Sequence, residues 1–426
     1  MITATQRPPG FVLRDHVFRV PLRHHDPDSP EIEIFAREVV APGTEGLDLP
    51  WLVYLQGGPG GKSPRMPFPA WVRQATQEFR VLLLDQRGTG RSTPATRQTL
   101  ATLDSEHEQA EYLAEFRADA IVRDAELIRR ELMGDRPWTV LGQSFGGFCA
   151  LTYLSFAPEG LREVLITGGV PPLSEGPDEV YRACYPEVLA HNDAYYARYP
   201  EDVDTARRVR DHLADQWVLL PTGAVLTPEC FQTLGDMLGQ ASRFDGLHAL
   251  LEEAFVDGRR GPELSDTFLR GVDGALSFAG SPLYAVLHES IYCQHEASQW
   301  SAHRVRSEFP QFDGSGQLVV FTGEMIYPWM FEQDPALGPL RGAAELLAKK
   351  ADWPALYDLD RLERNDVPVA AAVFHDDMFV NRTLSLRSAE RVRGMRTWVT
   401  NEFAHDGLRA DAAVLERVLG MARGQL

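Results

Sequence analysis

The sequence predicts an α/β protein, in which an open and mostly parallel sheet carries helices on both faces and a long, mainly helical domain is inserted. Two observations support this fold class. Up to residue 171, runs typical of buried strands alternate with helical patterns, which is the order of a parallel sheet with right-handed crossovers. After a long stretch with few strand-like runs, strand patterns return. We therefore expect core segments at 1–171 and 361–426 and an inserted domain at 172–360.

The first predicted elements are strands. Alternating apolar and polar residues at 16–24 and 31–40 indicate an antiparallel hairpin. Continuous apolar runs at 49–58 and 79–88 indicate parallel strands that are buried on both faces. A Gly/Pro-rich loop and a short helix at 71–78 lie between them.

The remaining core elements follow the same alternation. Apolar residues at helical spacing over 111–132 predict one amphipathic crossover helix that ends at Gly134. A strand at 138–144 leads directly into a helix, and another strand follows at 161–169. Two late strands, at 367–375 and 395–403, are each followed by a helical segment.

Composition and charge exclude several classes of partner. The chain has 426 residues, 44% of them hydrophobic and 24% charged, which is typical of a folded, soluble protein. Its net charge of −19 repels phosphate backbones and anionic lipid, so we expect neither nucleic acid nor a membrane as partner. The oligomeric state stays open.

Localisation and cofactors are also constrained. The first residues lack the apolar stretch of about 7 to 15 residues that a secretory signal needs. The apolar run at 369–374 is far shorter than the roughly 20 residues of a membrane span. Four widely spaced cysteines form no CxxC pair, which argues against a zinc site or a disulfide scaffold. We expect a cytoplasmic protein without a metal or an organic cofactor.

The segment GQSFGG at 142–147 places Ser144 between a predicted strand and a predicted helix. A Gly-x-Ser-x-Gly sequence in this context is typical of a nucleophile elbow, whose sharp turn holds the hydroxyl clear of the sheet. The amide of Phe145 then lies at the positive helix N-terminus, facing a developing oxyanion. In LQGGPGG at 55–61, the amide of Gly58 is the candidate second donor.

A nucleophilic serine needs a base, and the base needs an orienting acid. On a parallel sheet the ends of the strands converge at one edge, where distant residues meet. His405 follows the last predicted strand and is the candidate base, with His375 as its competitor. Asp376 and Asp377 both follow the preceding strand, and the spacing alone leaves open which of them faces the histidine.

Together these motifs resemble the proline iminopeptidases, also called prolyl aminopeptidases. The similar segments are LQGGPGG, DQRGTGRS at 85–92, GQSFGG, the acid in DDMF and the histidine in NEFAHDGLRAD. The family consists of serine peptidases of the α/β-hydrolase fold that remove an N-terminal proline. The insertion, with GEMIYPWMF, is similar to the larger bacterial form. One departure is Gln56, where the family usually has histidine.

The resemblance implies roles for single residues. Ser144 is expected to be the nucleophile, His405 the base and Asp377 the orienting acid. Gly58 and Phe145 are expected to supply the oxyanion amides.

The same resemblance implies that glutamates of the inserted domain bind the substrate's N-terminus, for which Glu289 and Glu324 are the candidates. Either can instead be a salt-bridge partner. In DQRGTGRS, Asp85 and Arg87 are expected to brace the loops near the site. Aromatic residues of the insertion are candidates for a pocket around the pyrrolidine ring or for core packing: Tyr292, Tyr327, Trp329 and Phe331.

The expected function is that of a serine aminopeptidase that releases N-terminal proline through an acyl-enzyme, with peptides that have a free N-terminal proline as its substrates. An esterase, or an aminopeptidase of broader specificity, with the same triad is the alternative. A non-catalytic, hydrolase-like binding protein is less favoured, because all three triad residues are present.

Overall fold

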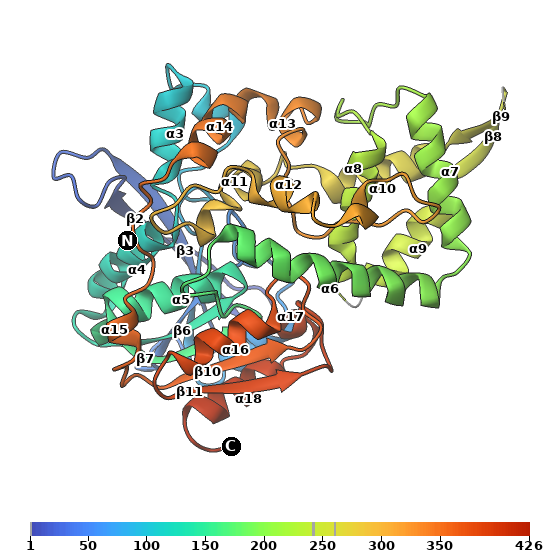
Figure 1. Ribbon diagram of the computed structural model, residues 1–426. Helices are drawn as coiled ribbons and strands as arrows, with labels where there is room; N and C mark the ends of the chain where they lie inside the picture. Colours follow the sequence, from blue (N-terminus) through green and yellow to red (C-terminus); the bar gives the residue numbers. More distant parts are fainter. Residues whose placement is uncertain (1, 241–242, 260) are drawn as a thin grey trace.

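The computed structural model describes residues 2–240, 243–259 and 261–426. Its core is a nine-stranded sheet that runs through the molecule (Figure 1). In spatial order the strands are β1 Ile2–Gln6, β2 Val12–Pro21, β3 Glu31–Val40, β5 Arg80–Leu84, β4 Trp51–Leu55, β6 Trp138–Gln143, β7 Leu161–Thr167, β10 Val369–Phe374 and β11 Met395–Thr400.

The sheet is antiparallel at one end and parallel over the rest. β1, β2, β3 and β5 pair antiparallel, whereas β5, β4, β6, β7, β10 and β11 pair parallel. The leading hairpin, the four buried strands of the first segment and the two late strands therefore lie where the sequence predicts them. β1 is an addition: all five of its residues are exposed, so its sequence carries no pattern of a buried face.

Helices cover both faces of the sheet. The apolar sides of α4 Ala118–Met133 and α5 Phe145–Phe156 belong to one core cluster, and α1 Ala70–Ala75 and α18 Ala413–Ala422 belong to the cluster on the opposite face. The other core helices are α2 Arg97–Leu100, α3 Glu106–Ala114, α16 Arg382–Glu390 and α17 Gly407–Ala410.

The single helix predicted over 111–132 is wrong, because the chain forms α3 and α4 with a break at 115–117. At the break the Arg117 side chain is buried and donates to three backbone carbonyls of the insertion. Its distances to these oxygens are 3.0 Å for Ser290, 2.7 Å for Cys293 and 2.8 Å for Pro354. These tertiary contacts outweigh the local helical pattern.

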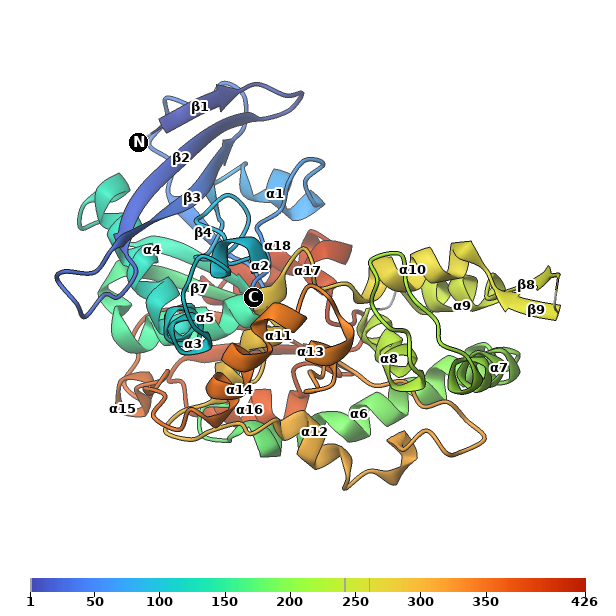
Figure 2. The ribbon, with the colours of Figure 1, turned by 90° about the horizontal axis from the view of Figure 1, so that it is seen from above.

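The segment between β7 and β10 is mainly helical, as predicted, although its exact boundaries stay a prediction. It lies over one edge of the core and extends beyond it on one side, where α7, α9 and a small hairpin form the far end (Figures 1 and 2). Its helices are α6 Pro177–Arg198, α7 Asp202–Asp215, α8 Pro228–Gln232, α9 Phe244–Glu252, α10 Asp266–Leu276, α11 Pro282–Leu287, α12 Ser301–Arg306, α13 Met330–Gln333, α14 Arg341–Lys349 and α15 Leu359–Leu362.

Two further features of this segment are a 3-10 helix, η2 Thr233–Gly239, and the hairpin of β8 Phe255–Gly258 and β9 Gly261–Leu264. We call the segment from α6 to α15 the cap. Among the residues that the structure describes, no helix is both long enough and apolar enough to cross a bilayer.

Candidate active site

Ser144 lies in a strained turn between β6 and α5. Its φ of 55° and ψ of −126° belong to a region that residues other than glycine rarely adopt, and such strain is typical of functional turns. A Cβ on Gly142 would overlap the carbonyl of Gly146, and one on Gly146 would overlap the carbonyl of Leu55. The two glycines of the motif therefore allow the turn, as the sequence pattern predicts.

His405 and Asp377 meet at the same edge of the sheet. Nδ1 of His405 lies 2.7 Å from Oδ2 of Asp377, and both side chains are buried. The other carboxylate oxygen of Asp377 accepts the amides of Phe379 at 2.9 Å and Val380 at 3.0 Å, which fixes its orientation. Asp376 instead contacts the exposed His375. The contact with His405 thus belongs to Asp377 rather than to its neighbour.

The electrostatics of His405 depend on its acidic neighbours. Burial disfavours the imidazolium, but the charge and hydrogen bond of Asp377 and the charge of Glu324 outweigh it and raise the pKa of His405 to about 8. Because Nδ1 donates to Asp377, Nε2 is the acceptor of the neutral ring.

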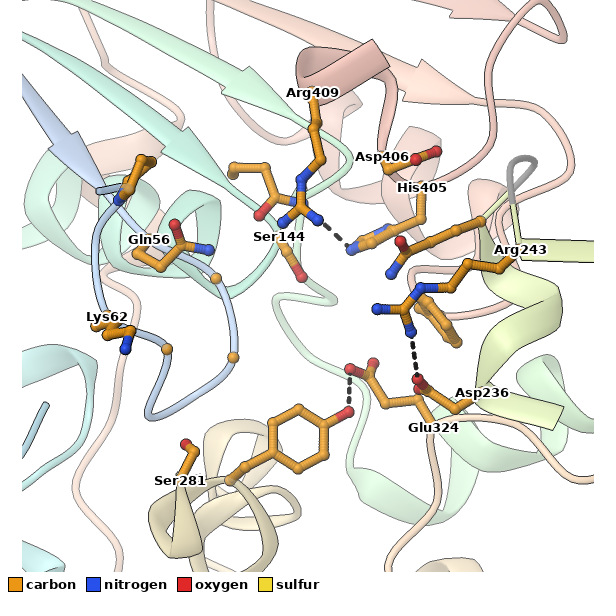
Figure 3. A pocket seen from close by; sticks show the side chains of 18 of the residues that line it. Gln56, Lys62, Ser144, Asp236, Arg243, Ser281, Glu324, His405, Asp406 and Arg409 are labelled. Carbon is orange, nitrogen blue, oxygen red and sulfur yellow. Dashed lines mark hydrogen bonds and ion pairs between the residues drawn. The ribbon is translucent and has the colours of Figure 1, made fainter. Parts of the chain in front are cut away.

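Nε2 of His405 has a neighbour that the sequence analysis does not single out. The Gln143 amide nitrogen lies 3.4 Å from it, the contact that Figure 3 draws as a dashed line at the His405 ring. Among the described residues, Ser144 and His405 form no hydrogen bond with each other, although they border the same cavity. Catalytic hydrogen bonds are often long before substrate binds and tighten in the complex.

The glycine loop after β4 lies against the elbow. A Cβ on Gly57 would lie 2.9 Å from Cβ of Ser144, so only glycine allows this approach, and Gly57 and Gly58 both line the cavity beside the serine. Asp85 braces the loop: it accepts the amide of Ser63 at 3.1 Å and forms an ion pair with Arg65. The bracing role predicted for Asp85 thus has a structural basis.

The predicted bracing role of Arg87 also has a structural basis. Its side chain is buried and bonds the Asp124 carboxylate, with Nε 2.7 Å from Oδ2, and the carbonyls of Leu22 and Glu115 at 2.9 and 2.6 Å. Arg87 thereby ties the loop after β5 to α4 and to the end of β2.

A cavity of about 800 Å³ separates the triad from the cap, which is a size typical of small-ligand sites. The core contributes Gly57, Ser144 and His405 to its wall, and the cap contributes Asp236, Tyr284 and Glu324. Figure 3 shows Ser144 on one side of this space and Glu324 with Asp236 on the other. The described residues contain no group of three or more His, Cys, Asp or Glu side chains arranged to hold a metal ion.

Two cap carboxylates give the cavity an acidic wall. Glu324 accepts the hydroxyl of Tyr284, and its burial together with the nearby charge of Asp236 raises its pKa to about 8. Burial also raises the pKa of Asp236, which lies 3.8 Å from Arg243. A cationic ligand between these carboxylates would favour the ionised form of both.

Comparison with known proteins shows which family has a similar sequence. Residues 50–244 match the family described as the alpha/beta hydrolase fold. The chain is 49% identical over 418 residues to a proline iminopeptidase of Aeromonas sobria, with 97% of each chain covered. The chain belongs to the proline iminopeptidase family. The family and the α/β-hydrolase fold predicted from the sequence are confirmed.

Two further similar proteins were found. The proline iminopeptidase aneH of Aspergillus aculeatus is 38% identical to this member of the family, over 93% of this chain and 90% of its own. Among solved structures, a proline iminopeptidase-related protein of Thermus thermophilus aligns with 97% of this chain and 98% of its own, at 17% identity and a TM-score of 0.42.

The two predicted cap glutamates differ in their surroundings. Glu324 borders the cavity, whereas Glu289 does not. The Glu289 carboxylate is buried against the start of α12, where its two oxygens accept the amides of Ser301 at 3.1 Å and Ala302 at 2.9 Å. In this structure Glu289 thus caps a helix away from the cavity, and the prediction that it binds substrate stays a prediction without structural support.

Of the two roles left open for the cap aromatics, their surroundings favour core packing for most of them. Tyr292, Tyr327 and Phe331 are buried in the core of the cap, and Trp329 borders a separate small cavity. The aromatic side chains at the substrate cavity come from other segments: Tyr54, Phe68, Trp71, Phe278, Tyr284 and Phe379.

Among the polar residues that line the cavity and that sequence reasoning missed are Gln143, Asp236 and Arg409. Gln143 and Arg409 lie inside motifs already noted, GQSFGG and NEFAHDGLRAD, so their position next to Ser144 and after His405 was an available signal. Asp236 lies in TLGDMLG, which carries no chemical signature.

Proposed function

We propose that the protein is a serine-type proline iminopeptidase that releases N-terminal proline from peptides through an acyl-enzyme. The observation that carries the proposal is the position of Glu324, a carboxylate at the same cavity as Ser144 and His405. A carboxylate opposite the nucleophile suits a substrate whose free amine belongs to the same residue as the scissile carbonyl. Membership in the proline iminopeptidase family supports the same reaction.

In the proposed acylation step, the Ser144 hydroxyl attacks the prolyl carbonyl and transfers its proton to Nε2 of His405. Asp377 keeps the Nδ1–H tautomer and stabilises the imidazolium that forms. The amides of Gly58 and Phe145 are the proposed oxyanion donors. Gly57 packs directly on Ser144, which keeps the glycine loop close enough for this role.

The imidazolium then gives its proton to the leaving amine, so that the C–N bond breaks and the prolyl group remains on Ser144. In the second step a water molecule attacks the ester. His405 takes a proton from the water and returns one to Ser144, which releases proline. No group beyond the residues named takes part in this scheme.

Recognition of the substrate's amine is proposed for Glu324 together with Asp236, in place of Glu289. The secondary ammonium of an N-terminal proline carries two N–H donors, and the two carboxylates offer it two acceptors. Charge-assisted hydrogen bonds of this kind are the strong ones in a protein. An acylated N-terminus would lose the charge and meet a partly desolvated acidic wall, so blocked peptides are poor substrates in this scheme.

The test compares four substrates on the purified protein: prolyl-β-naphthylamide, its N-acetylated form, the alanyl analogue and a short-chain ester. Preference for the free prolyl amide is the expected result. Preference for the ester would indicate an esterase, and equal rates with the alanyl analogue would indicate a broader aminopeptidase. Labelling of wild type but not Ser144→Ala by a fluorophosphonate probe distinguishes both from a binding protein without catalysis, which no probe would label.

A further inference from the structure

We propose that Arg409 binds the free α-carboxylate of the residue that leaves, so that proline-containing dipeptides are preferred over longer peptides. This inference rests on the proposed function and extends it to the leaving-group side of the same site. Arg409 belongs to α17, four residues after His405, and lines the same cavity as Ser144 and Glu324. Figure 3 shows its guanidinium directed toward Ser144 from the side opposite Glu324.

Among the described residues, the exposed Arg409 side chain forms no ion pair. In the part of the chain that the structure describes, no carboxylate lies within ion-pair distance of it, and Asp406 on the same turn points away (Figure 3). The other two arginines of the cavity differ, because Arg65 pairs with Asp85 and Arg243 lies 3.8 Å from Asp236.

The acidic and basic side chains of the cavity therefore lie on opposite sides of Ser144. Glu324 and Asp236 form an acidic wall on the cap side, and Arg409 adds a positive charge on the core side. A dipeptide with an N-terminal proline has the same polarity: its ammonium precedes the scissile carbonyl, and its carboxylate follows within one residue, about 3.5 Å of chain. Placing the carbonyl at Ser144 directs the carboxylate toward the core side of the cavity.

The chemistry of arginine suits this role. A guanidinium offers a planar fork of donors that matches a carboxylate with two parallel hydrogen bonds. In a longer peptide the same position holds a neutral amide, whose carbonyl accepts only weaker bonds. The discrimination is therefore between a free carboxylate and an amide, and not between side chains of the leaving residue.

The experiment measures kcat/KM for prolyl-alanine and for prolyl-alanine amide, and takes the ratio of the two for each variant. Wild type is expected to favour the free dipeptide, and Arg409→Met is expected to lower the ratio about tenfold, the value of a modest charge-assisted hydrogen bond. Arg409→Lys keeps the charge but loses the fork, so part of the ratio returns. Any general loss of activity affects both substrates and cancels in the ratio.

Two control variants test whether the change in the kcat/KM ratio is specific to Arg409. Arg162→Met removes an exposed positive charge from β7, far from the cavity wall, and should leave the ratio unchanged. Lys62→Met removes the positive charge of the glycine loop, also at the cavity. A fall of the ratio in Lys62→Met but not in Arg409→Met, or in all three variants alike, overturns the assignment to Arg409.

The outcomes separate this inference from the proposed function. If wild type cleaves prolyl-β-naphthylamide but Arg409→Met keeps the wild-type ratio, the carboxylate site is wrong and the iminopeptidase assignment stands. If wild type cleaves no free prolyl substrate, the proposed function is wrong, and the carboxylate site is overturned with it.

Discussion

The two walls of the cavity are built in different ways. On the core side, Ser144, Asp377 and His405 each follow the end of a parallel strand, β6, β10 or β11, and the pairing of these strands sets their relative positions. On the cap side, Asp236 lies in a short 3-10 helix and Glu324 in a segment without regular structure. Proton transfer requires closely fixed atoms, whereas recognition of a charged amine tolerates more variation, and the two walls match these needs.

The largest effect expected from this comparison is on the core wall. Asp377→Asn removes the acceptor that holds the Nδ1–H tautomer of His405, so kcat should fall about 10⁴-fold on amide and ester substrates alike. Asp376→Asn is the matched control, because its side chain is exposed and contacts only His375, and it should retain activity. Steady-state kinetics of both variants check this, and a larger loss in Asp376→Asn would contradict the assignment.

The next largest effect is on the cap wall and depends on the substrate. Glu324→Gln keeps the shape of the side chain but removes the charge that meets the ammonium, so kcat/KM for prolyl-β-naphthylamide should fall about 100-fold. The short-chain ester lacks the ammonium and should lose much less. Glu332→Gln, which alters an exposed ion pair with Arg341, serves as control. Equal losses on both substrates would remove Glu324 from amine recognition.

A smaller effect is expected on the pH dependence, because the charge of Glu324 on the cap wall influences the pKa of His405 on the core wall. His405 accepts a proton only when it is neutral, so kcat/KM for the ester should rise with pH and level off above the His405 pKa of about 8. The negative charge of Glu324 is one cause of that raised pKa. In Glu324→Gln the His405 pKa should fall and the rising limb should move to lower pH with it, so that the ester is cleaved faster than by wild type at pH values near the limb, where Glu324 is partly ionised in wild type. Well below pH 8 Glu324 is itself protonated, and the two rates should converge.

The pH profile is measured on the ester, because the prolyl substrate adds the titration of its own amine and of Glu324. The Glu332→Gln variant should keep the wild-type limb. A limb that stays in place in Glu324→Gln would mean that the two walls titrate independently.

The core wall is also the part that sequence reasoning describes best. Strand ends of a parallel sheet converge, so the order of Ser144, the DDMF acid and His405 along the chain was enough to place them together. Spacing alone left the choice between Asp376 and Asp377 open, and the family resemblance favoured Asp377. The structure supplies the physical reason, because adjacent residues in a loop point to different sides and only Asp377 accepts the amides of 379 and 380.

The cap wall could not be predicted as well, for a physical reason. Its residues are placed by the packing of short helices and irregular segments, which leave no periodic signal in the sequence. Glu289 and Glu324 both look like anionic anchors in the sequence, but only contacts distinguish a helix cap from a cavity residue. The break between α3 and α4 could not be predicted for the same reason, since it depends on hydrogen bonds from Arg117 to carbonyls more than 170 residues away in the sequence.

The last prediction separates these two glutamates and has the smallest effect on selectivity. Glu289→Ala leaves the amides of Ser301 and Ala302 without their acceptors in a buried position, at a cost of about 1–3 kcal/mol for each amide. Thermal unfolding should therefore occur at lower temperature than in wild type. At a temperature where the variant is folded, the ratio of prolyl amide to ester activity should equal that of wild type, because the carboxylate does not reach the cavity. A selective loss on the prolyl substrate would return Glu289 to the binding site and remove the distinction between the two cap glutamates.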